Sequence, residues 1–264
     1  MGKSRIVYMG TPEFAVTVLT ELIRHGENIV GVITAPDKAA GRGRKISQSA
    51  VKKYADLQGI KTLQPTNLKE ASFLDELAAL NADLQIVVAF RMLPKIVWDM
   101  PQLGTFNLHA SLLPQYRGAA PINWAIINGE IETGVTTFFL NHEIDKGAII
   151  MQEKVAIEPN MNAGALHDLL ANIGSKLVTK TCDAIASNTA NIIPQDHINH
   201  LDLAEAPKIF KQDCRIDWNE NTETIFNFIQ GLSPYPGSWT IFETESKKRL
   251  SCKIFDCTSL NMEH

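Results

Sequence analysis

Residues 5–34 read RIVYMGTPEFAVTVLTELIRHGENIVGVIT, and this stretch decides the fold class. Residues 5–10 form a short apolar run that ends in glycine, which is typical of a buried parallel strand. The Thr-Pro-Glu at 11–13 favours the start of a helix, because proline fits the first turn and an acid suits its positive end. Residues 28–34 supply a second apolar run. Strand, helix and strand in this order predict a right-handed crossover and a mostly parallel α/β sheet.

The composition is that of a globular protein, with 45% hydrophobic and 20% charged residues among 264. No stretch is long and apolar enough to cross a membrane, and the N-terminus lacks the features of a secretory signal, so we expect a cytoplasmic protein. The net charge of −4 argues against bulk affinity for nucleic acid but leaves room for a local basic contact. The cysteine spacings fit no zinc or redox motif, and the first turn lacks the G-x-G-x-x-G fingerprint of dinucleotide binding.

Further elements follow the opening unit. We expect a central strand at 84–90, another ending at Asn107 to His109, and a long amphipathic helix at 163–186. Residues 189–207 have the composition of a linker. The sequence therefore predicts a first domain over 1–188 and a smaller one over 208–264, whose few strands are too short to close a sheet of their own.

Three polar residues could carry chemistry together. Asn107 and His109 lie two apart at a strand end, so their side chains point to the same face, and Asp145 lies in a loop before the next strand. An amide and an imidazole can stabilise an oxyanion, and a carboxylate can orient the imidazole and accept a proton. Two alternatives stay open: ordinary structural hydrogen bonds, and a metal site of His109, Asp145 and His142, which no ligand spacing supports.

A glycine-rich basic loop at 35–48 carries Lys38, Arg42, Arg44 and Lys45. Long loops without secondary structure of their own are commonly functional, and this one could grip phosphates. The alternative is a solvated surface loop with ordinary cations.

Several short motifs follow one another along the chain. In order they are Gly10-Thr11-Pro12-Glu13-Phe14, Pro36-Asp37, Ala40-Gly41-Arg42-Gly43, Asn107-Leu108-His109, Ser111-Leu112-Leu113-Pro114, Tyr116-Arg117-Gly118-Ala119-Ala120-Pro121, Glu132-Thr133-Gly134-Val135-Thr136, Asp145-Lys146-Gly147, Arg215-Ile216-Asp217-Trp218 and Pro234-Tyr235-Pro236. In this order they resemble the folate-dependent formyltransferase family. The resemblance implies a Rossmann-like catalytic domain and a smaller C-terminal β-barrel of oligonucleotide-binding type, which the short chain would leave incomplete.

The resemblance also implies an activity in translation initiation. A transferase of this kind moves the formyl group of 10-formyltetrahydrofolate to the amino group of the methionyl moiety on initiator methionyl-tRNA, without a metal and as a monomer. Asn107, His109 and Asp145 match the family's catalytic residues, and the basic loop residues match its tRNA contacts. Folate would contact two segments: Ser111, Leu112, Leu113 and Pro114, and Phe90, Arg91, Met92 and Leu93.

The segment AFRMLP at 89–94 departs from the AYGLILP of tRNA-acting members and is similar to that of glycinamide ribonucleotide formyltransferases. Two alternatives stand beside the tRNA reaction. One is formyl transfer to a small amine, either an amino-sugar nucleotide or glycinamide ribonucleotide. The other is a folate- or RNA-binding module without catalysis.

Overall fold

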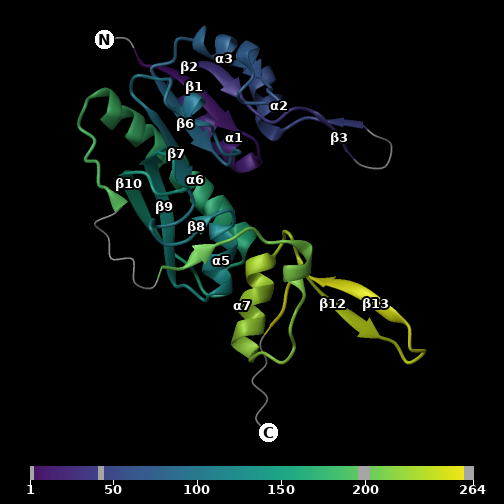
Figure 1. Cartoon of the computed structure of the whole chain (residues 1–264). Coiled ribbons are helices and arrows are strands. Elements are labelled where there is room, and N and C mark those ends of the chain that lie inside the picture. Colours follow the sequence, from purple (N-terminus) through teal and green to yellow (C-terminus); the bar gives the residue numbers. More distant parts are fainter. Residues whose placement is uncertain (1–2, 41–44, 196–202, 259–264) are drawn as a thin grey trace. The chain divides into compact units, whose positions relative to one another are not determined.

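The structure is a computed structural model that describes residues 3–40, 45–195 and 203–258, without the side chains of residues 39, 40, 45 and 46. The chain divides into two compact units. The first comprises residues 1–109, 135–153 and 171–199, and the second comprises residues 110–134, 154–170 and 200–264. Figure 1 shows the chain with many of its helices and strands labelled.

Among the described residues, the main sheet has seven strands. The order across the sheet is β10 (Ile149–Ala156), β9 (Glu132–Phe139), β7 (Thr105–His109), β6 (Leu84–Val88), β1 (Arg5–Gly10), β2 (Asn28–Ile33) and β5 (Thr62–Leu63). The pairs β1–β2, β1–β6, β2–β5 and β6–β7 are parallel, whereas β7 and β9 are antiparallel. This mostly parallel sheet confirms the predicted α/β fold.

The strand order indicates at which edge of the main sheet a ligand is expected to bind. β1 lies between β2 and β6, so the chain crosses over in both directions from its first strand. In open sheets of this kind, ligands bind outside the carboxyl ends of the strands near the point where the order reverses. For β1, β6 and β7 those ends are Gly10, Val88 and His109.

Helices connect the strands of the first unit. They are α1 (Glu13–Arg24), α2 (Ala50–Leu57), α3 (Ala71–Ala78), α4 (Lys95–Trp98) and the part of α6 (Ala163–Ala186) from residue 171. Helix α1 buries Phe14, Val18 and Leu22, which recur at helical spacing. Ser49 caps α2, since its hydroxyl oxygen accepts a hydrogen bond of 3.0 Å from the Lys52 backbone N–H. No helix in the described part of the chain has the length and apolar character that a membrane crossing requires.

The apolar core of the first unit joins the strands to the helix α3. Val7, Met9 and Ile33 from β1 and β2 pack with Phe73 and Leu77 of α3. The same cluster includes Leu63, Leu68, Leu80, Val87, Leu93 and Val97. Burial of these side chains is the main favourable contribution to folding, because each removes apolar surface from water.

The segment predicted as a loop at 35–48 contains a β-ribbon instead. Strand β3 (Lys38–Ala40), labelled in Figure 1, pairs antiparallel with β4 (Lys45–Ser47), and Lys38 lies opposite Ser47. A strand of three residues is too short to show an alternation of apolar and polar side chains, so the sequence did not predict this pairing.

The second unit combines helices with short strand pairs. Its elements are β8 (Arg117–Gly118), α5 (Pro121–Ile127), β11 (Glu205–Ala206), η2 (Lys211–Cys214), α7 (Thr222–Leu232), β12 (Ser238–Glu243) and β13 (Arg249–Ile254). β8 pairs with β11, and β12 pairs antiparallel with β13. Gly118 has φ +126°, and a Cβ there would lie 2.4 Å from the Ala206 carbonyl oxygen, so only glycine permits the β8–β11 pairing.

Truncation of a buried leucine in α3 should weaken the fold. Leu77 is 1% exposed in the core, whereas Leu57 at the end of α2 is 82% exposed. Because Leu77→Ala leaves a cavity, we expect it to lower the free energy of unfolding by about 2–5 kcal/mol. Leu57→Ala should change it by under about 0.5 kcal/mol. Urea unfolding measures both, and equal effects would contradict the core assignment.

Candidate functional site

Strand β7 carries the first two candidate residues to the edge of the sheet. Asn107 and His109 alternate with the buried Leu108, so they share one face of the strand. Asn107 lies between Val87 of β6 and Phe138 of β9 and is half-buried, and His109 lies opposite Thr136 and is buried. Asn107 is therefore held by strand pairing on both sides of β7, and His109 by its pairing with β9.

The third candidate, Asp145, comes close to His109. The distance from His109 Nδ1 to Asp145 Oδ2 is 3.9 Å, and the side chains are 7% and 15% exposed. This is an ion-pair distance, longer than a hydrogen bond. The structure thus brings together an imidazole and a carboxylate that are far apart in the sequence, in a setting largely shielded from water.

The loop that carries Asp145 has to run back along the sheet. β9 ends at Phe139, which pairs with Phe106, three residues before His109. At about 3.3 Å per residue, the loop must return roughly 10 Å to bring Asp145 beside the imidazole. Two backbone features accompany this path: Asp145 has φ +53°, and a Cβ at Gly147 would lie 1.6 Å from the Phe139 carbonyl oxygen.

The first predicted folate segment lies in the second unit. Ser111 is buried, and its hydroxyl donates a hydrogen bond of 2.6 Å to the Gln115 carbonyl oxygen. Leu113 and Pro114 are buried and Leu112 is half-buried. The contacts of this segment with folate stay a prediction.

The second predicted folate segment follows β6 in the first unit. The Arg91 guanidinium donates to the backbone carbonyl oxygens of Thr66, at 2.9 Å, and of Pro65, and it lies 5.7 Å from the centre of the Phe90 ring. Leu93 is 8% exposed in the apolar core, whereas Met92 is 71% exposed. Arg91 and Leu93 thus have structural partners, and a folate contact by this segment stays a prediction.

The predicted tRNA-binding residues are only partly described. Lys38 is exposed on β3. Arg42 and Arg44 lie outside the described residues, as does the side chain of Lys45, whose backbone belongs to β4.

Sequence reasoning missed Gln195, which it placed in a linker. The Gln195 side-chain amide donates hydrogen bonds to the carbonyl oxygens of Asp145, at 2.9 Å, and of Gly147, at 2.7 Å. A glutamine fifty residues from its acceptors leaves no periodic or spacing signal, so only the three-dimensional structure reveals the contact.

One group in the described residues could hold a cation. Ligand atoms of His25, Glu27 and Asp183 lie within 4.8 Å of one another. The Glu27 carboxylate already accepts a hydrogen bond from the Lys3 ammonium at 3.2 Å and lies 2.9 Å from His25 Nδ1. Because these contacts balance the charge of Glu27, the group is explained as an ion-pair cluster.

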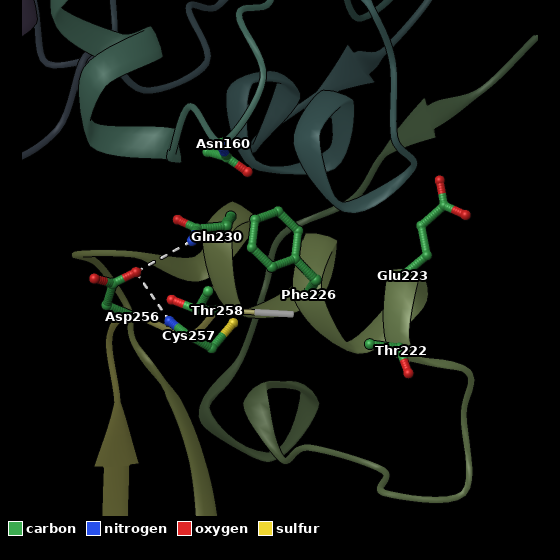
Figure 2. A pocket seen from close by; sticks show the side chains of 8 residues that line it. All are labelled: Asn160, Thr222, Glu223, Phe226, Gln230, Asp256, Cys257 and Thr258. Carbon is green, nitrogen blue, oxygen red and sulfur yellow. Dashed lines mark hydrogen bonds between the residues drawn. The ribbon is translucent and has the colours of Figure 1, made fainter. Parts of the chain in front are cut away.

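A separate cavity of about 740 Å³ lies in the second unit (Figure 2). Gln230 donates to Asp256 Oδ1 at 3.3 Å, and the Cys257 backbone N–H donates to the same oxygen at 2.9 Å. Burial, and then the Asp256 charge, raise the pKa of Cys257, so its thiol stays protonated and weakly nucleophilic at neutral pH. The remaining lining residues are Asn160, Thr222, Glu223, Phe226 and Thr258, and none of the predicted site residues is among them.

Comparison with known proteins adds two family matches. Residues 4–182 match the family model described as formyl transferase, and residues 208–264 match the model of the formyl transferase C-terminal domain.

Individual proteins agree with the family matches. The methionyl-tRNA formyltransferase of Parabacteroides distasonis is 56% identical over 98% of this chain and 81% of its own length. Among solved structures, a 4-N formyltransferase from Francisella tularensis has a TM-score of 0.70 at 19% identity, covering 95% of this chain and 97% of that one. HypX from Aquifex aeolicus, in complex with tetrahydrofolic acid, has a TM-score of 0.66 at 18% identity over 90% of this chain and 36% of that one.

A methyl group at residue 147 should disturb the loop that carries Asp145. Gly147→Ala places a Cβ against the backbone oxygen of Phe139, which cannot move without breaking the β9 edge. Gly59→Ala is the control, because Gly59 has φ +67° and no atom within 4 Å of the new Cβ. We expect Gly59→Ala to cost about 1–2 kcal/mol of unfolding free energy from the backbone alone. Gly147→Ala should cost more in urea unfolding, and an equal or smaller cost would contradict the contact.

Proposed function

The chain belongs to the formyl transferase family, and from this we propose that it transfers a formyl group from 10-formyltetrahydrofolate to the amino group of the methionyl moiety on initiator methionyl-tRNA. The observation that carries the proposal is the 56% identity, over 98% of the chain, to a protein named methionyl-tRNA formyltransferase. At this identity the site residues and the acceptor are expected to be shared. The reaction belongs to translation initiation, and we propose that the protein works in the cytoplasm as a monomer.

We assign the reaction to the residues at the end of β7. The free amine of the methionyl group attacks the formyl carbon, a C–N bond forms, and the carbonyl oxygen becomes an oxyanion. The Asn107 amide and the His109 imidazole donate hydrogen bonds to that oxygen. Their common strand face supports this assignment, because two donors must converge on one atom.

Asp145 has two functions in this mechanism. Its carboxylate, 3.9 Å from His109 Nδ1, orients the imidazole. It also accepts the proton that the attacking amine loses, directly or through water. Collapse of the tetrahedral intermediate breaks the bond between the formyl carbon and the folate nitrogen, and that nitrogen takes up the proton that Asp145 accepted, directly or through water, as tetrahydrofolate leaves. These three side chains supply every group that the transfer needs, so we assign no step to a metal.

The substrates are assigned to segments by the family resemblance. We propose that Ser111–Pro114 and residues 90–93 contact the folate. The basic residues Lys38, Arg42, Arg44 and Lys45 would contact tRNA phosphates, which Lys and Arg neutralise with release of counterions. The exposure of Lys38 is consistent with this function.

A small amine acceptor is not favoured, because the relative at 56% identity acts, by its name, on methionyl-tRNA. A direct assay separates the possibilities. The protein is mixed with 10-formyltetrahydrofolate and, in parallel, with charged initiator tRNA, an amino-sugar nucleotide or glycinamide ribonucleotide. Release of tetrahydrofolate only with charged tRNA is expected. Turnover with a small amine alone would replace the proposal, and no turnover with any acceptor would favour a binding module.

Removal of the Asp145 charge should slow turnover while the fold survives. Asp145→Asn keeps the size of the side chain but cannot accept the amine proton, so we expect kcat to fall by about 10²–10⁴-fold. Glu143→Gln in the same loop is the matched control, since Glu143 pairs with Lys146 at 3.0 Å and is exposed. Its kcat should stay within about twofold, because exposed ion pairs contribute little. Near-normal turnover of Asp145→Asn would refute the assignment.

Removal of one basic side chain should weaken tRNA binding in a salt-dependent way. For Arg42→Ala we expect the slope of log affinity against log salt to fall by about one, because one phosphate contact is lost. Arg24→Ala is the control, since that exposed guanidinium pairs with Glu21 at 2.6 Å on α1. An unchanged slope for Arg42→Ala would make the basic segment an ordinary solvated surface.

A further inference from the structure

Gln195 lies in the last chain segment of the first unit, residues 171–199, and its side chain contacts the loop that carries Asp145. Its side-chain amide donates one hydrogen bond to the Asp145 carbonyl oxygen, at 2.9 Å, and one to the Gly147 carbonyl oxygen, at 2.7 Å. Both N–H groups of a single amide thus span three consecutive residues of the loop. Gln195 is 1% exposed, so these bonds form away from competing water.

A backbone bridge next to Gln195 holds its chain segment against the main sheet. Ile193, two residues earlier, forms an antiparallel bridge with Ile149 at the start of β10. Each backbone N–H of this pair donates to the other residue's carbonyl oxygen at 2.8 Å. The bridge attaches the segment to the sheet, and the Gln195 side chain then hydrogen-bonds from this segment to the loop.

The loop requires an external restraint at this place. Asp145 adopts φ +53°, a left-handed conformation that is unfavourable for residues with a Cβ. Residues in such conformations persist only when the surroundings over-determine them. The two hydrogen bonds from Gln195 fall on the carbonyl groups of Asp145 and of Gly147, two residues on.

We propose that Gln195 is a positioning residue for the formyl transfer: its amide clamps the backbone at 145–147 so that the Asp145 carboxylate stays beside His109. The inference rests on the proposed function of Asp145. Gln195 itself contacts the loop backbone, and its effect on the reaction passes through Asp145.

The variant Gln195→Met removes both amide donors at nearly the same side-chain length. A misplacement of about 1 Å can slow a reaction by about 10²-fold, so we expect kcat to fall between tenfold and a hundredfold. The KM values for folate and for charged tRNA should stay within about twofold, because the proposal gives Gln195 no substrate contact. Hydrogen exchange should accelerate in peptides covering residues 141–148 and remain unchanged at β1.

Gln230→Met is the matched control. The Gln230 amide is also buried and donates a hydrogen bond of 3.3 Å to Asp256 Oδ1, and neither residue is assigned to catalysis or to substrate contact. Its kcat should stay within twofold. If Gln195→Met does not fold, Gln195→Ala provides the same test with a smaller side chain, and thermal unfolding of each variant verifies the folded state.

A double variant separates positioning from general stability. If Gln195 acts through Asp145, then Asp145→Asn with Gln195→Met should be no slower than Asp145→Asn alone. Multiplied losses in the double variant would overturn the proposal, and so would a normal kcat for Gln195→Met. Normal turnover of Asp145→Asn alone would overturn both the catalytic assignment and the clamp, whereas a slow Asp145→Asn beside a normal Gln195→Met would remove only the clamp.

Discussion

The candidate site depends on one geometric constraint, the antiparallel register of β7 and β9. His109 lies opposite Thr136, yet β9 continues to Phe139 before the chain turns. A tight turn at that point would leave the next residues beside Phe106, roughly 10 Å from the imidazole. The loop at 140–148 must therefore fold back along the sheet, and the proximity of Asp145 to His109 exists only because it does.

The two hydrogen bonds from Gln195 act on the backbone of this loop. A left-handed φ at Asp145 costs about 1–2 kcal/mol. The two hydrogen bonds from Gln195 contribute about 1 kcal/mol each, which offsets that cost. The distance from His109 Nδ1 to Asp145 Oδ2 is 3.9 Å, which is too long for a hydrogen bond between these two atoms. We infer that the backbone places the Asp145 side chain beside His109, so the resting ion pair need not do so.

Sequence patterns predicted regular secondary structure, in which side chains alternate or recur with a fixed period. The apolar run at 5–10 is β1, the run at 84–90 contains β6, and the helix expected at 163–186 is α6. Alternation along β7 put Asn107 and His109 on one face. The ribbon of β3 and β4 was missed because strands of three residues have no usable period. Gln195 and the partners of Arg91 were missed because hydrogen bonds to distant backbone carbonyls impose no pattern on the sequence.

The identity of the acceptor cannot come from the fold. A 4-N formyltransferase shares the fold at 19% identity, although its name differs from that of the relative at 56% identity, so the fold alone does not determine the acceptor. We infer that parts outside β7 and the Asp145 loop contribute to the choice of acceptor. We propose that the β3–β4 ribbon contributes to this choice, because its pairing orders the backbone of Lys38 and Lys45, two of the residues assigned to tRNA. With that backbone already ordered, less conformational entropy is lost when these two residues bind phosphates than if the strands were unpaired.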